Sequence, residues 1–413
     1  MSSEKNVSEK TNMVLIINAG SSSLKCSLFD VQGSEITQHF RVKVANLSGP
    51  ARLEIYDHSV NPDGVLVDKE TLSAEQLGVA DKQAHASALK VVLQWIEKNT
   101  PHFKVAWIGH RVVHGGDRYA EPVVIDTEVL EFLETLIPLA PLHQPYNLKL
   151  IHLCREFLPE SPQVACFDTS FHSTTPVVAR EFAIPQKLTE EGIRRYGFHG
   201  LSYEYIYDKL ERLDPDLAQQ KLLVAHLGAG SSMCAINKGT SLASTMGFTA
   251  VEGLPMGTRS GQLDPGVMLY LMQEKGWDAK QLENFLYKEC GWFGVSGGIS
   301  SDMLTLKKSD DPLAKKAIDI LVYRIMRETG SLTAALGGLD VFVFTGGVGE
   351  NDADLRAAVV KENAWLGMKL DPARNKANEY LISADDSRVK VFAIPTNEEK
   401  MIARHTLKQL GVA

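Results

Sequence analysis

The sequence lacks the features of a membrane, secreted or zinc-binding protein. It contains no run of about 18 apolar residues, so no helix is expected to cross a membrane. Its five cysteines are scattered without CxxC spacing, which predicts reduced thiols in a cytosolic protein rather than disulfides or a zinc site. The opening residues MSSEKNVSEKTN are polar and hold no apolar segment of the kind that a signal peptide needs. We therefore expect a cytoplasmic protein with a disordered leader over residues 1–12 and no membrane partner.

An excess of basic residues is also lacking. The 43 Lys and Arg residues against 51 Asp and Glu residues give a net charge of −8, which argues against a general nucleic-acid binder. Anionic small substrates are not excluded, because a few local cations decide their binding. The 413 residues are 44% hydrophobic and 23% charged. This composition predicts a globular protein of two or three domains whose core needs no disulfide or metal.

No GxxxxGK[ST] phosphate loop occurs, but the chain twice places a turn of small residues between two apolar strands. The tetrapeptide Ala-Gly-Ser-Ser at 19–22 follows a strand expected at 13–18. It recurs at 229–232 after a strand expected at 222–227, and each time another strand follows. Small residues and hydroxyls at such a turn let the backbone approach a phosphate. The repeat predicts a duplicated unit, and hence two related domains.

A third glycine-rich turn, at 345–351, follows an apolar strand at 340–344 and precedes a helical pattern that begins at Asp352. A strand that leads into such a turn and a helix presents backbone N–H groups to anions. Helical periodicity occurs at 83–98, 126–138, 145–157, 265–289 and 312–335, with a closing helix over 396–410. The alternation of strands and helices predicts an α/β fold.

Arginine and histidine gather in short segments rich in glycine or proline. These segments lie at 109–116, 140–145, 194–200 and 256–261. Such side chains, held close to accessible backbone, suit a carboxylate or phosphate ligand. Asp168 follows a strand at 164–167, a common position for a functional carboxylate. A single histidine is more often structural than functional, and on the residues alone we interpret as structural His110, His114, His172 and His226.

Nine motifs occur in one order over residues 13–404. They are NAGSSSLK (18–25), GHRVVHGG (109–116), APLHQP (140–145), FDTSFH (167–172), RRYGFHG (194–200), HLGAGSS (226–232), MGTRSG (256–261), FTGGVGEN (344–351) and IPTNEE (394–399). In these motifs and their order the sequence closely resembles the acetate kinase family, which includes propionate kinases. The resemblance implies the duplicated two-domain fold of sugar kinases, actin and the heat-shock ATPases, with ribonuclease H-like domains and a nucleotide in the cleft between them.

The resemblance also implies a division of labour between the domains. The N-terminal domain would comprise 13–167 plus 396–413 and hold the acceptor. The C-terminal domain, 168–395, would bind the nucleotide and form a homodimer.

The family's reaction is the reversible, Mg²⁺-dependent transfer of the γ-phosphoryl group of ATP to acetate, which gives acetyl phosphate and ADP by direct in-line transfer. Mn²⁺ is an alternative metal. One alternative is the same chemistry with propionate as the preferred acceptor. A second, from another class, is a nucleotide-switched binding protein of the same fold. A Rossmann dehydrogenase is disfavoured, because no GxGxxG opens a helix after the first strand.

By the resemblance, five residues take part in the transfer. Arg111 would bind the substrate carboxylate, and Asp168 would orient the acceptor or exchange protons with it. Arg259 and His199 would stabilise the transferring group, with His143 beside them. Transfer of a phosphoryl group between two anions depends mainly on positioning and electrostatic stabilisation, which cationic side chains supply.

Further residues match the family's acyl pocket, metal site and nucleotide loops. The acyl pocket would be lined by Val113, Leu142 and Ala250, and the metal held by Asn18 and Glu398. The residues matched to the phosphate turn are Ser21, Ser23 and Lys25. Those matched to the nucleotide loops are His226, Leu227, Gly228, Ala229, Gly230, Asp302, Met303, Leu304, Gly347, Val348, Gly349, Glu350 and Asn351.

The sequence departs from the family pattern at three positions. Ala229 stands where asparagine is usual, which predicts weaker ATP binding or a local compensation. Leu304 stands after Asp302 where arginine is common, which removes a contact to the nucleotide. Ala250 replaces a common proline and leaves more room for propionate, although one methylene changes discrimination by only about 1–3 kcal/mol.

Overall fold

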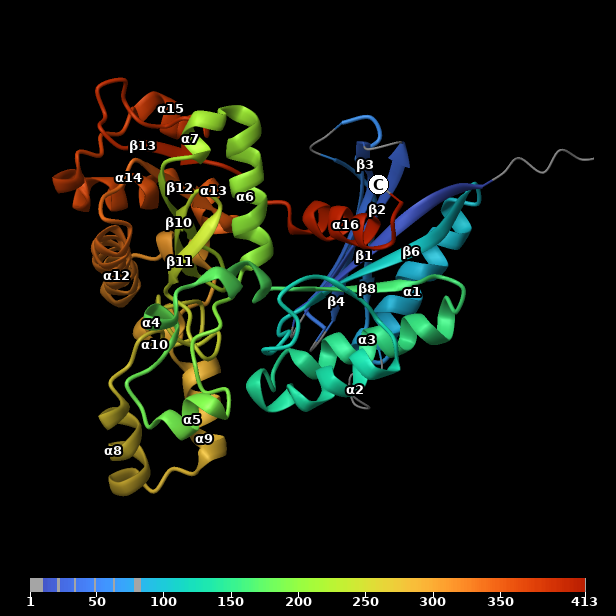
Figure 1. Ribbon diagram of the computed structural model, residues 1–413, viewed down its shortest axis with the longest axis horizontal. Coiled ribbons are helices and arrows are strands. Elements are labelled where there is room, and N and C mark those ends of the chain that lie inside the picture. The colour runs from blue at the N-terminus through green and yellow to red at the C-terminus, as the bar shows by residue number, and fades with distance from the viewer. Residues whose placement is uncertain are drawn as a thin grey trace, which may run out of the picture. The chain divides into compact units, whose positions relative to one another are not determined.

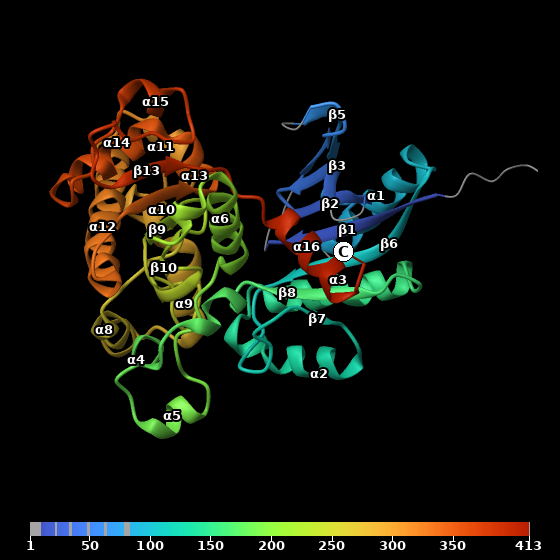
Figure 2. The same ribbon diagram turned by 45° about the horizontal axis from the view of Figure 1, so that its top comes forward.

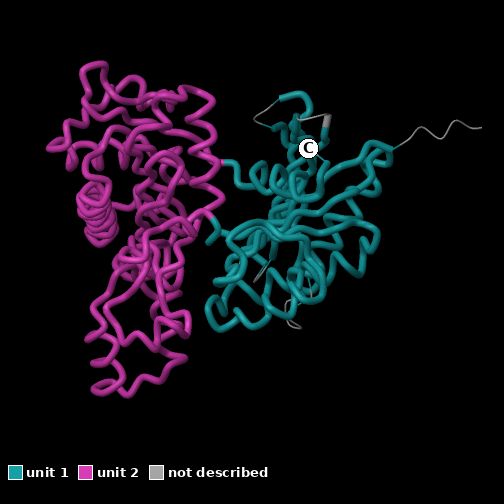
Figure 3. Tube along the Cα trace, viewed as in Figure 1, with its two compact units in different colours: residues 1–170, 397–413 teal, residues 171–396 magenta. Residues whose placement is uncertain are grey.

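The computed structural model describes residues 10–20, 23–32, 35–47, 50–61, 64–77 and 83–412 (Figure 1). The chain divides into two compact units (Figure 3). Unit 1 is Met1–Ser170 with Asn397–Ala413, and unit 2 is Phe171–Thr396. Within the described ranges, no helix combines the length and the apolar composition that crossing a membrane requires.

Unit 1 is built on an eight-stranded sheet with the order β5-β4-β3-β2-β1-β6-β8-β7. The strands are β1 (Thr11–Ala19), β2 (Ser23–Gln32), β3 (Glu35–Ala45), β4 (Ala51–Asp57), β5 (Val65–Leu72), β6 (Phe103–Val112), β7 (Val123–Val124) and β8 (Gln163–Phe167). Strand β1 is antiparallel to β2 and parallel to β6, and β6 is parallel to β8. The carboxyl ends of β1, β6 and β8 therefore meet at one edge of the sheet.

Helices pack against this sheet (Figure 2). They are α1 (Ala84–Asn99), α2 (Thr127–Thr135), η1 (Ile137–Leu139), α3 (Gln144–Phe157) and α16 (Glu398–Gln409). The last helix, α16, packs against β1, β6 and β8 so closely that a side chain at Gly109 would clash with Thr406 and Ile402. The end of the chain thus lies against the same strands as its beginning.

Unit 2 repeats the central part of this topology. Its five-stranded sheet has the order β11-β10-β9-β12-β13. The strands are β9 (Lys221–His226), β10 (Ser232–Asn237), β11 (Thr240–Ser244), β12 (Val341–Thr345) and β13 (Lys390–Ala393). Strand β9 is antiparallel to β10 and parallel to β12, which is parallel to β13. The order and directions match those of β3-β2-β1-β6-β8, which confirms the duplication predicted from the repeated tetrapeptide.

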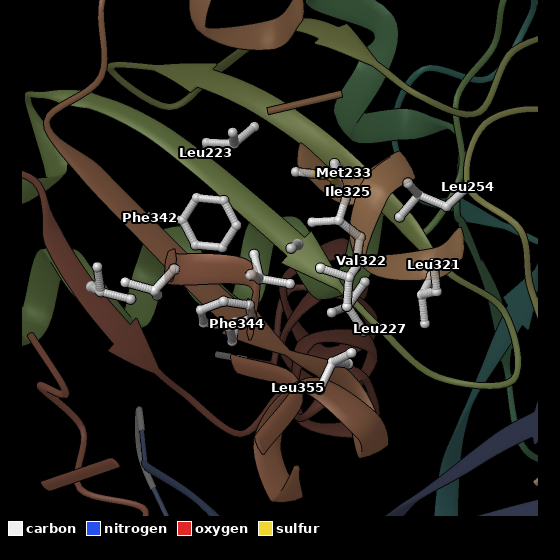
Figure 4. Packing of buried hydrophobic residues seen from close by; sticks show 14 of the residues in the cluster. Leu223, Leu227, Met233, Leu254, Leu321, Val322, Ile325, Phe342, Phe344 and Leu355 are labelled. Atoms are coloured by element: carbon white, nitrogen blue, oxygen red, sulfur yellow. The ribbon is translucent and has the colours of Figure 1, made fainter. Parts of the chain in front are cut away.

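One apolar core of unit 2 lies between this sheet and α12 (Pro312–Leu336), and a second is formed by the sheet with α6 (Gly200–Leu213). Leu321, Ile325, Leu332 and Leu336 fall on one face of α12 at helical spacing and are buried. They belong to one apolar cluster with Leu223 of β9 and with Phe342 and Phe344 of β12, part of which Figure 4 shows. The other helices of unit 2 are η2 (Ser170–Thr174), α4 (Val177–Arg180), α5 (Gln186–Glu190), α7 (Pro215–Ala218), α8 (Pro265–Lys275), α9 (Ala279–Asn284), η3 (Phe285–Glu289), α10 (Gly291–Val295), α11 (Met303–Lys307), α13 (Gly346–Asn351), α14 (Ala353–Glu362), η4 (Ala364–Leu366) and α15 (Pro372–Lys376).

Two local expectations are wrong. The single helix expected at 265–289 is broken, because Gly276 ends α8 in the left-handed conformation with φ 69°. Asp278 then begins α9 with a capping box to Gln281. The glycine-rich turn at 345–351 is itself helical and forms α13, which Thr345 precedes in an extended conformation.

The boundaries also differ from those expected. Strand β1 begins at Thr11, inside the expected leader, whereas residues 1–9 lie outside the described residues. Asp168 belongs to unit 1 rather than to the second domain, because its N–H donates to Val112 O at 3.1 Å. The neighbouring Thr169 likewise accepts a hydrogen bond from Gly115 N.

The buried side chain of His172 in unit 2 should make the free energy of unfolding depend on pH. Its Nε2 donates to Phe198 O and its Nδ1 pairs with Ser241 Oγ, both at 2.9 Å. Burial lowers its pKa from 6.5 to about 4. Below pH 6.5 the unfolded chain therefore binds a proton that the folded chain excludes, and folding loses about 2 kcal/mol between pH 7 and pH 5.

Denaturant unfolding at pH 7 and pH 5 measures this loss. His172→Gln should lose about 2 kcal/mol less stability than the wild type between these pH values. Replacement of the exposed His102 by glutamine should keep the wild-type dependence. An identical pH dependence in His172→Gln and the wild type would show that His172 is not held neutral.

Arg356 of α14 is fully buried, and all five of its N–H donors have an acceptor. Its Nη1 donates to Gly349 O and Glu350 O at 2.9 and 2.7 Å. Its Nε and Nη2 reach Asn375 Oδ1, Asn375 O and Asn378 Oδ1 at 2.5–2.8 Å. The guanidinium thereby joins α13, α14 and the segment around α15.

Replacement of Arg356 by methionine should leave these buried acceptors without hydrogen-bond donors. We expect it to lower the free energy of unfolding by about 3–5 kcal/mol. Arg212→Met is the matched control, since Arg212 of α6 is 62% exposed and pairs with Asp208 one turn away in its own helix. The control should change stability by less than about 0.5 kcal/mol. Equal stabilities of the two variants in denaturant unfolding would contradict the assignment.

Candidate active site

In unit 1, three predicted site residues lie at the ends of neighbouring strands. Asn18 is near the end of β1, Arg111 near the end of β6, and Asp168 directly follows β8. The register pairs Ile17 with His110 and Arg111 with Cys166. The parallel arrangement of β1, β6 and β8 therefore brings the three side chains together.

Arg111 is held by both neighbours. Its Nε and Nη2 donate to the two oxygens of Asp168, at 3.0 Å to Oδ1 and 2.5 Å to Oδ2. Its Nη1 donates to Asn18 Oδ1 at 3.2 Å. These contacts, among the described residues, use three of the five guanidinium donors, and a bound carboxylate takes two. The geometry thus suits a fixed arginine that also receives an anion.

Burial and the opposite charge of the partner act against each other on both members of this pair. The Asp168 side chain is only 2% exposed and that of Arg111 is 16% exposed. Burial acts to lower the pKa of Arg111, but Asp168 and Glu398 together raise it above its usual value. Burial raises the pKa of Asp168, and Arg111 opposes that shift. The guanidinium therefore keeps its charge, and the carboxylate partly neutralises it.

The first turn of α16 brings two carboxylates to Asn18. Asn397 begins this helix, and its side chain accepts from Lys400 N at 2.8 Å. Asn18 Nδ2 lies 3.4 Å from Glu398 Oε2 and 3.2 Å from Glu399 Oε1. Glu399 is buried and was not predicted. The doubled glutamate of the IPTNEE motif was the signal that could have identified it.

The chemistry of these donors bears on the predicted metal. Mg²⁺ binds oxygen ligands, often one or two carboxylates with phosphate oxygens and retained waters. The carboxylate of Glu398 and the amide oxygen of Asn18 fit such a set. In the described part of the chain, no group of three or more His, Cys, Asp or Glu residues could hold a metal ion. The two oxygen donors, by their chemistry, suit a metal that also binds phosphate oxygens.

The segment predicted to bind phosphate lies between β1 and β2. Gly20 N donates to Ser23 O at 2.9 Å and closes the hairpin. Lys25 of β2 pairs in register with Asn18 of β1. The predicted Ser21 lies outside the described residues. The described part of the turn thus places a lysine on the strand beside Asn18.

Val113 and Leu142, predicted for the acyl pocket, and His143 lie in two adjoining segments of unit 1. Val113 is buried, and its N–H donates to Asn147 Oδ1 of α3 at 3.1 Å. Gln144 Nε2 donates to His114 O at 3.2 Å. Leu142 and His143 immediately precede α3. The structure thus joins the GHRVVHGG and APLHQP segments of unit 1.

In unit 2, His199 and Arg259 converge on Gly230. A Cβ at Gly230 would lie 2.8 Å from Arg259 Nη2 and 3.3 Å from His199 Nε2. His199 has φ 58°, an uncommon value for a residue other than glycine, and directly precedes α6. Its Nδ1 pairs with Ser232 Oγ at 2.8 Å, which leaves Nε2 facing Gly230. A side chain at position 230 would therefore displace the Arg259 guanidinium from this approach.

Backbone contacts hold the loop of Arg259. Met256 N donates to Arg259 O at 3.0 Å, and Trp292 N donates to Met256 O at 2.9 Å. Arg259 Nη1 donates to Ala250 O at 2.7 Å. Ala250, predicted for the acyl pocket, therefore also orients this guanidinium through its carbonyl group. That contact does not depend on the side chain at position 250.

The predicted nucleotide loops of unit 2 lie beside one another. Leu227 O accepts from Val348 N at 2.8 Å and from Gly349 N at 3.2 Å. Ala229 O accepts from Gly257 N at 3.2 Å. Residues 226–230 thus contact both α13 and the loop of Arg259 through backbone hydrogen bonds. The side chain at position 229 takes no part in these contacts.

Other residues assigned to the nucleotide have structural contacts of their own. Asp302 begins α11 and accepts from Thr305 N at 2.9 Å, while Leu304 is 62% exposed. One oxygen of Glu350 accepts from Gly346 N and Thr396 N, each at 2.9 Å. His226 stacks on His199 with ring centroids 4.2 Å apart. Ser202 and Ser232, which hold these two histidines, were not predicted.

Comparisons with known proteins identify the family of the chain. The model of the acetokinase family matches residues 13–404. The chain is 48% identical over 404 residues to the acetate kinase of Methylocella silvestris, which covers 96% of this chain and 98% of that protein. It is 46% identical to an acetate kinase of Rhodopseudomonas palustris over 96% and 98% of the two chains.

Solved structures show the same fold. A propionate kinase from Francisella tularensis matches with a TM-score of 0.84 and 34% identity, over 96% of this chain and 99% of that one. The acetate kinase of Porphyromonas gingivalis matches with a TM-score of 0.82 and 35% identity, over 97% and 100%. The two-domain α/β fold expected from the sequence is thereby confirmed. The chain belongs to the acetokinase family.

Proposed function

We propose that this protein is an acetate kinase, which transfers the γ-phosphoryl group of ATP reversibly to acetate and forms acetyl phosphate and ADP. The observation that carries the proposal is the convergence of Arg259 Nη2 and His199 Nε2 on Gly230. Two donors at a backbone without a side chain suit the oxygens of a transferring phosphoryl group. The acetate kinases that are 46–48% identical over 96% of this chain support the same activity.

The residues of unit 1 would bind and orient the acceptor. Arg111 would hold the acetate carboxylate through its remaining donors, while Asp168 fixes the plane of the guanidinium. Val113 and Leu142 would contact the methyl group, with Ala250 of unit 2 as the third lining residue. His143 would add a donor for the transferring group. A fixed guanidinium offsets the repulsion between two anions that must react.

The residues of unit 2 would bind the nucleotide and stabilise the charge of the phosphoryl group. The glycine-rich segments 226–230 and 346–351 would approach the phosphates and adenosine through their backbone. Arg259 and His199 would donate to the phosphoryl oxygens in transit. Ser23 and Lys25 of unit 1 would contact phosphate as well. Mg²⁺, or Mn²⁺, would be held by Asn18 and Glu398 and would neutralise phosphate charge when bound.

We also propose that the enzyme acts in the cytoplasm as a homodimer formed through unit 2. None of the five cysteines, all described, forms a disulfide, and burial raises the pKa of Cys154 to about 12. Such unreactive thiols suit a reducing compartment. Helix α8 exposes Leu269, Tyr270 and Met272, an apolar face that suits contact with a second copy. No nucleic-acid partner is proposed, in line with the net charge of −8.

Replacement of Arg111 or Arg259 by alanine should lower kcat/KM for acetyl phosphate formation about 10²–10³-fold, because each removes an electrostatic donor. Trapping of acetyl phosphate as its hydroxamate measures the rate, and circular dichroism checks that each variant is folded. The exposed Arg212→Ala is the control and should keep wild-type activity. A loss of less than tenfold in both folded variants would contradict the assigned roles.

The acceptor is tested by offering formate, acetate, propionate and butyrate in turn. We expect acetate to have the highest kcat/KM and propionate to follow within about 200-fold, since one methylene is worth about 1–3 kcal/mol. Ala250→Pro keeps the carbonyl that holds Arg259 and should lower the propionate-to-acetate ratio. A ratio above one in the wild type would favour the propionate kinase, an activity named for one of the structural neighbours. Failure to form any acyl phosphate would favour a nucleotide-switched binding protein.

A further inference from the structure

Thr396 is the residue at which the chain leaves unit 2. Its N–H donates to Glu350 Oε1 at 2.9 Å. Its hydroxyl oxygen accepts from Ser202 Oγ at 2.9 Å. Both the backbone and the side chain of this residue are therefore attached to elements of unit 2.

The contact with Glu350 leads to the glycine-rich helix α13. The same carboxylate oxygen accepts from Gly346 N, the first residue of that helix, at 2.9 Å. Glu350 lies near the end of α13, so its side chain folds back along the helix to reach both N–H groups. Hydrogen bonds to an ionised carboxylate are stronger than neutral ones. A shift of α13 would therefore displace Thr396 or break one of these bonds.

The contact with Ser202 leads to the histidines. Ser202 Oγ also pairs with His226 Nδ1 at 2.8 Å. His226 stacks on His199 at 4.2 Å. Thr396 is thus linked to α13 through Glu350 and to the end of β9 through Ser202.

The residues that follow Thr396 belong to the site of unit 1. Asn397 caps α16, and Glu398 is the first residue of that helix. Glu398 Oε2 lies 3.4 Å from Asn18 Nδ2. A single residue, Asn397, therefore separates the anchored Thr396 from a carboxylate of the unit 1 site.

We propose that Glu350 is a positioning residue that couples the nucleotide-binding helix α13 to Thr396 and the start of α16, and that its carboxylate does not bind the nucleotide. This inference rests on the proposed function, because it takes α13 as part of the nucleotide site. Nucleotide bound at the α13 backbone would restrict the helix. Through Glu350 the same restriction would reach the segment 396–400.

Hydrogen–deuterium exchange of the full-length protein with and without ADP tests the coupling. In the wild type, ADP should slow exchange both at 346–351 and at 396–400, by about tenfold or more. In Glu350→Ala the slowing at 346–351 should remain, while that at 396–400 should fall below about threefold. Glu350→Gln keeps an oxygen that accepts hydrogen bonds and should restore part of the effect. Glu362→Ala, at the exposed end of α14, is the matched control and should behave as the wild type.

Calorimetric titration with ADP separates positioning from ligand contact. We expect the Kd of Glu350→Ala for ADP to change by less than about threefold, whereas loss of a direct charged contact costs tenfold or more. Kinetically, kcat should fall while KM for ATP stays within the same limit. If Glu350→Ala does not fold, Glu350→Gln carries the same comparison with a smaller expected difference.

Three results would overturn the inference. One is wild-type slowing at 396–400 in a folded Glu350 variant, which would show that the carboxylate transmits nothing. Another is loss of slowing at 346–351 together with a tenfold weaker ADP affinity, which would make Glu350 a nucleotide ligand. In both cases the proposed acetate kinase activity stands. The third, absence of any slowing at 346–351 in the wild type, would overturn the nucleotide assignment of α13 as well.

Discussion

The pairing of Arg111 with Asp168 is the interaction on which the unit 1 site depends. A guanidinium that is 16% exposed needs acceptors, because a buried charge without partners is costly. The acceptors come from the strands on either side of β6, namely Asn18 of β1 and Asp168 after β8. The parallel register of these strands is thus a condition for keeping a fixed cation at the sheet edge. Without it, neither the carboxylate-binding role proposed for Arg111 nor the position of Asn18 beside Glu398 would follow.

Unit 2 has the same order of strands, but its polar side chains are held in a different way. Its two polar side chains, Arg259 and His199, meet at Gly230, where the absence of a side chain leaves room for them. The loops that carry them are fixed by backbone hydrogen bonds, such as Gly257 N to Ala229 O and Val348 N to Leu227 O. Donors fixed before a ligand arrives need no reorganisation during transfer, which is the main electrostatic contribution to such catalysis. The alanine at 229 is compatible with this arrangement, because the loop contacts use its carbonyl group.

Most features that depend on neighbouring residues were predicted correctly from the sequence, whereas features that depend on distant contacts were not. The apolar strands and the repeated turn were predictable, because alternation and small residues are local signals. The continuous helix at 265–289 was wrong, since periodicity did not register the helix end at Gly276 or the capping box at Asp278. The segment 346–351 forms a helix despite three glycines, which disfavour helix in isolation. Its hydrogen bonds to Leu227 and Arg356 supply what local propensity does not.

The sequence by itself determined the duplicated α/β plan, the motif set and hence the family, because these depend on residue types and their order. Through that resemblance it also led us to expect Arg111, Asp168, His199 and Arg259 as site residues. Only the tertiary structure decided which of them touch: that Asp168 belongs with Arg111 and Asn18, that Glu399 joins them, and that Glu350 turns toward Thr396. The reason is physical. A hydrogen bond forms only within about 3 Å, and residues 93 or 381 positions apart reach that distance through strand register and helix packing, which no local pattern encodes.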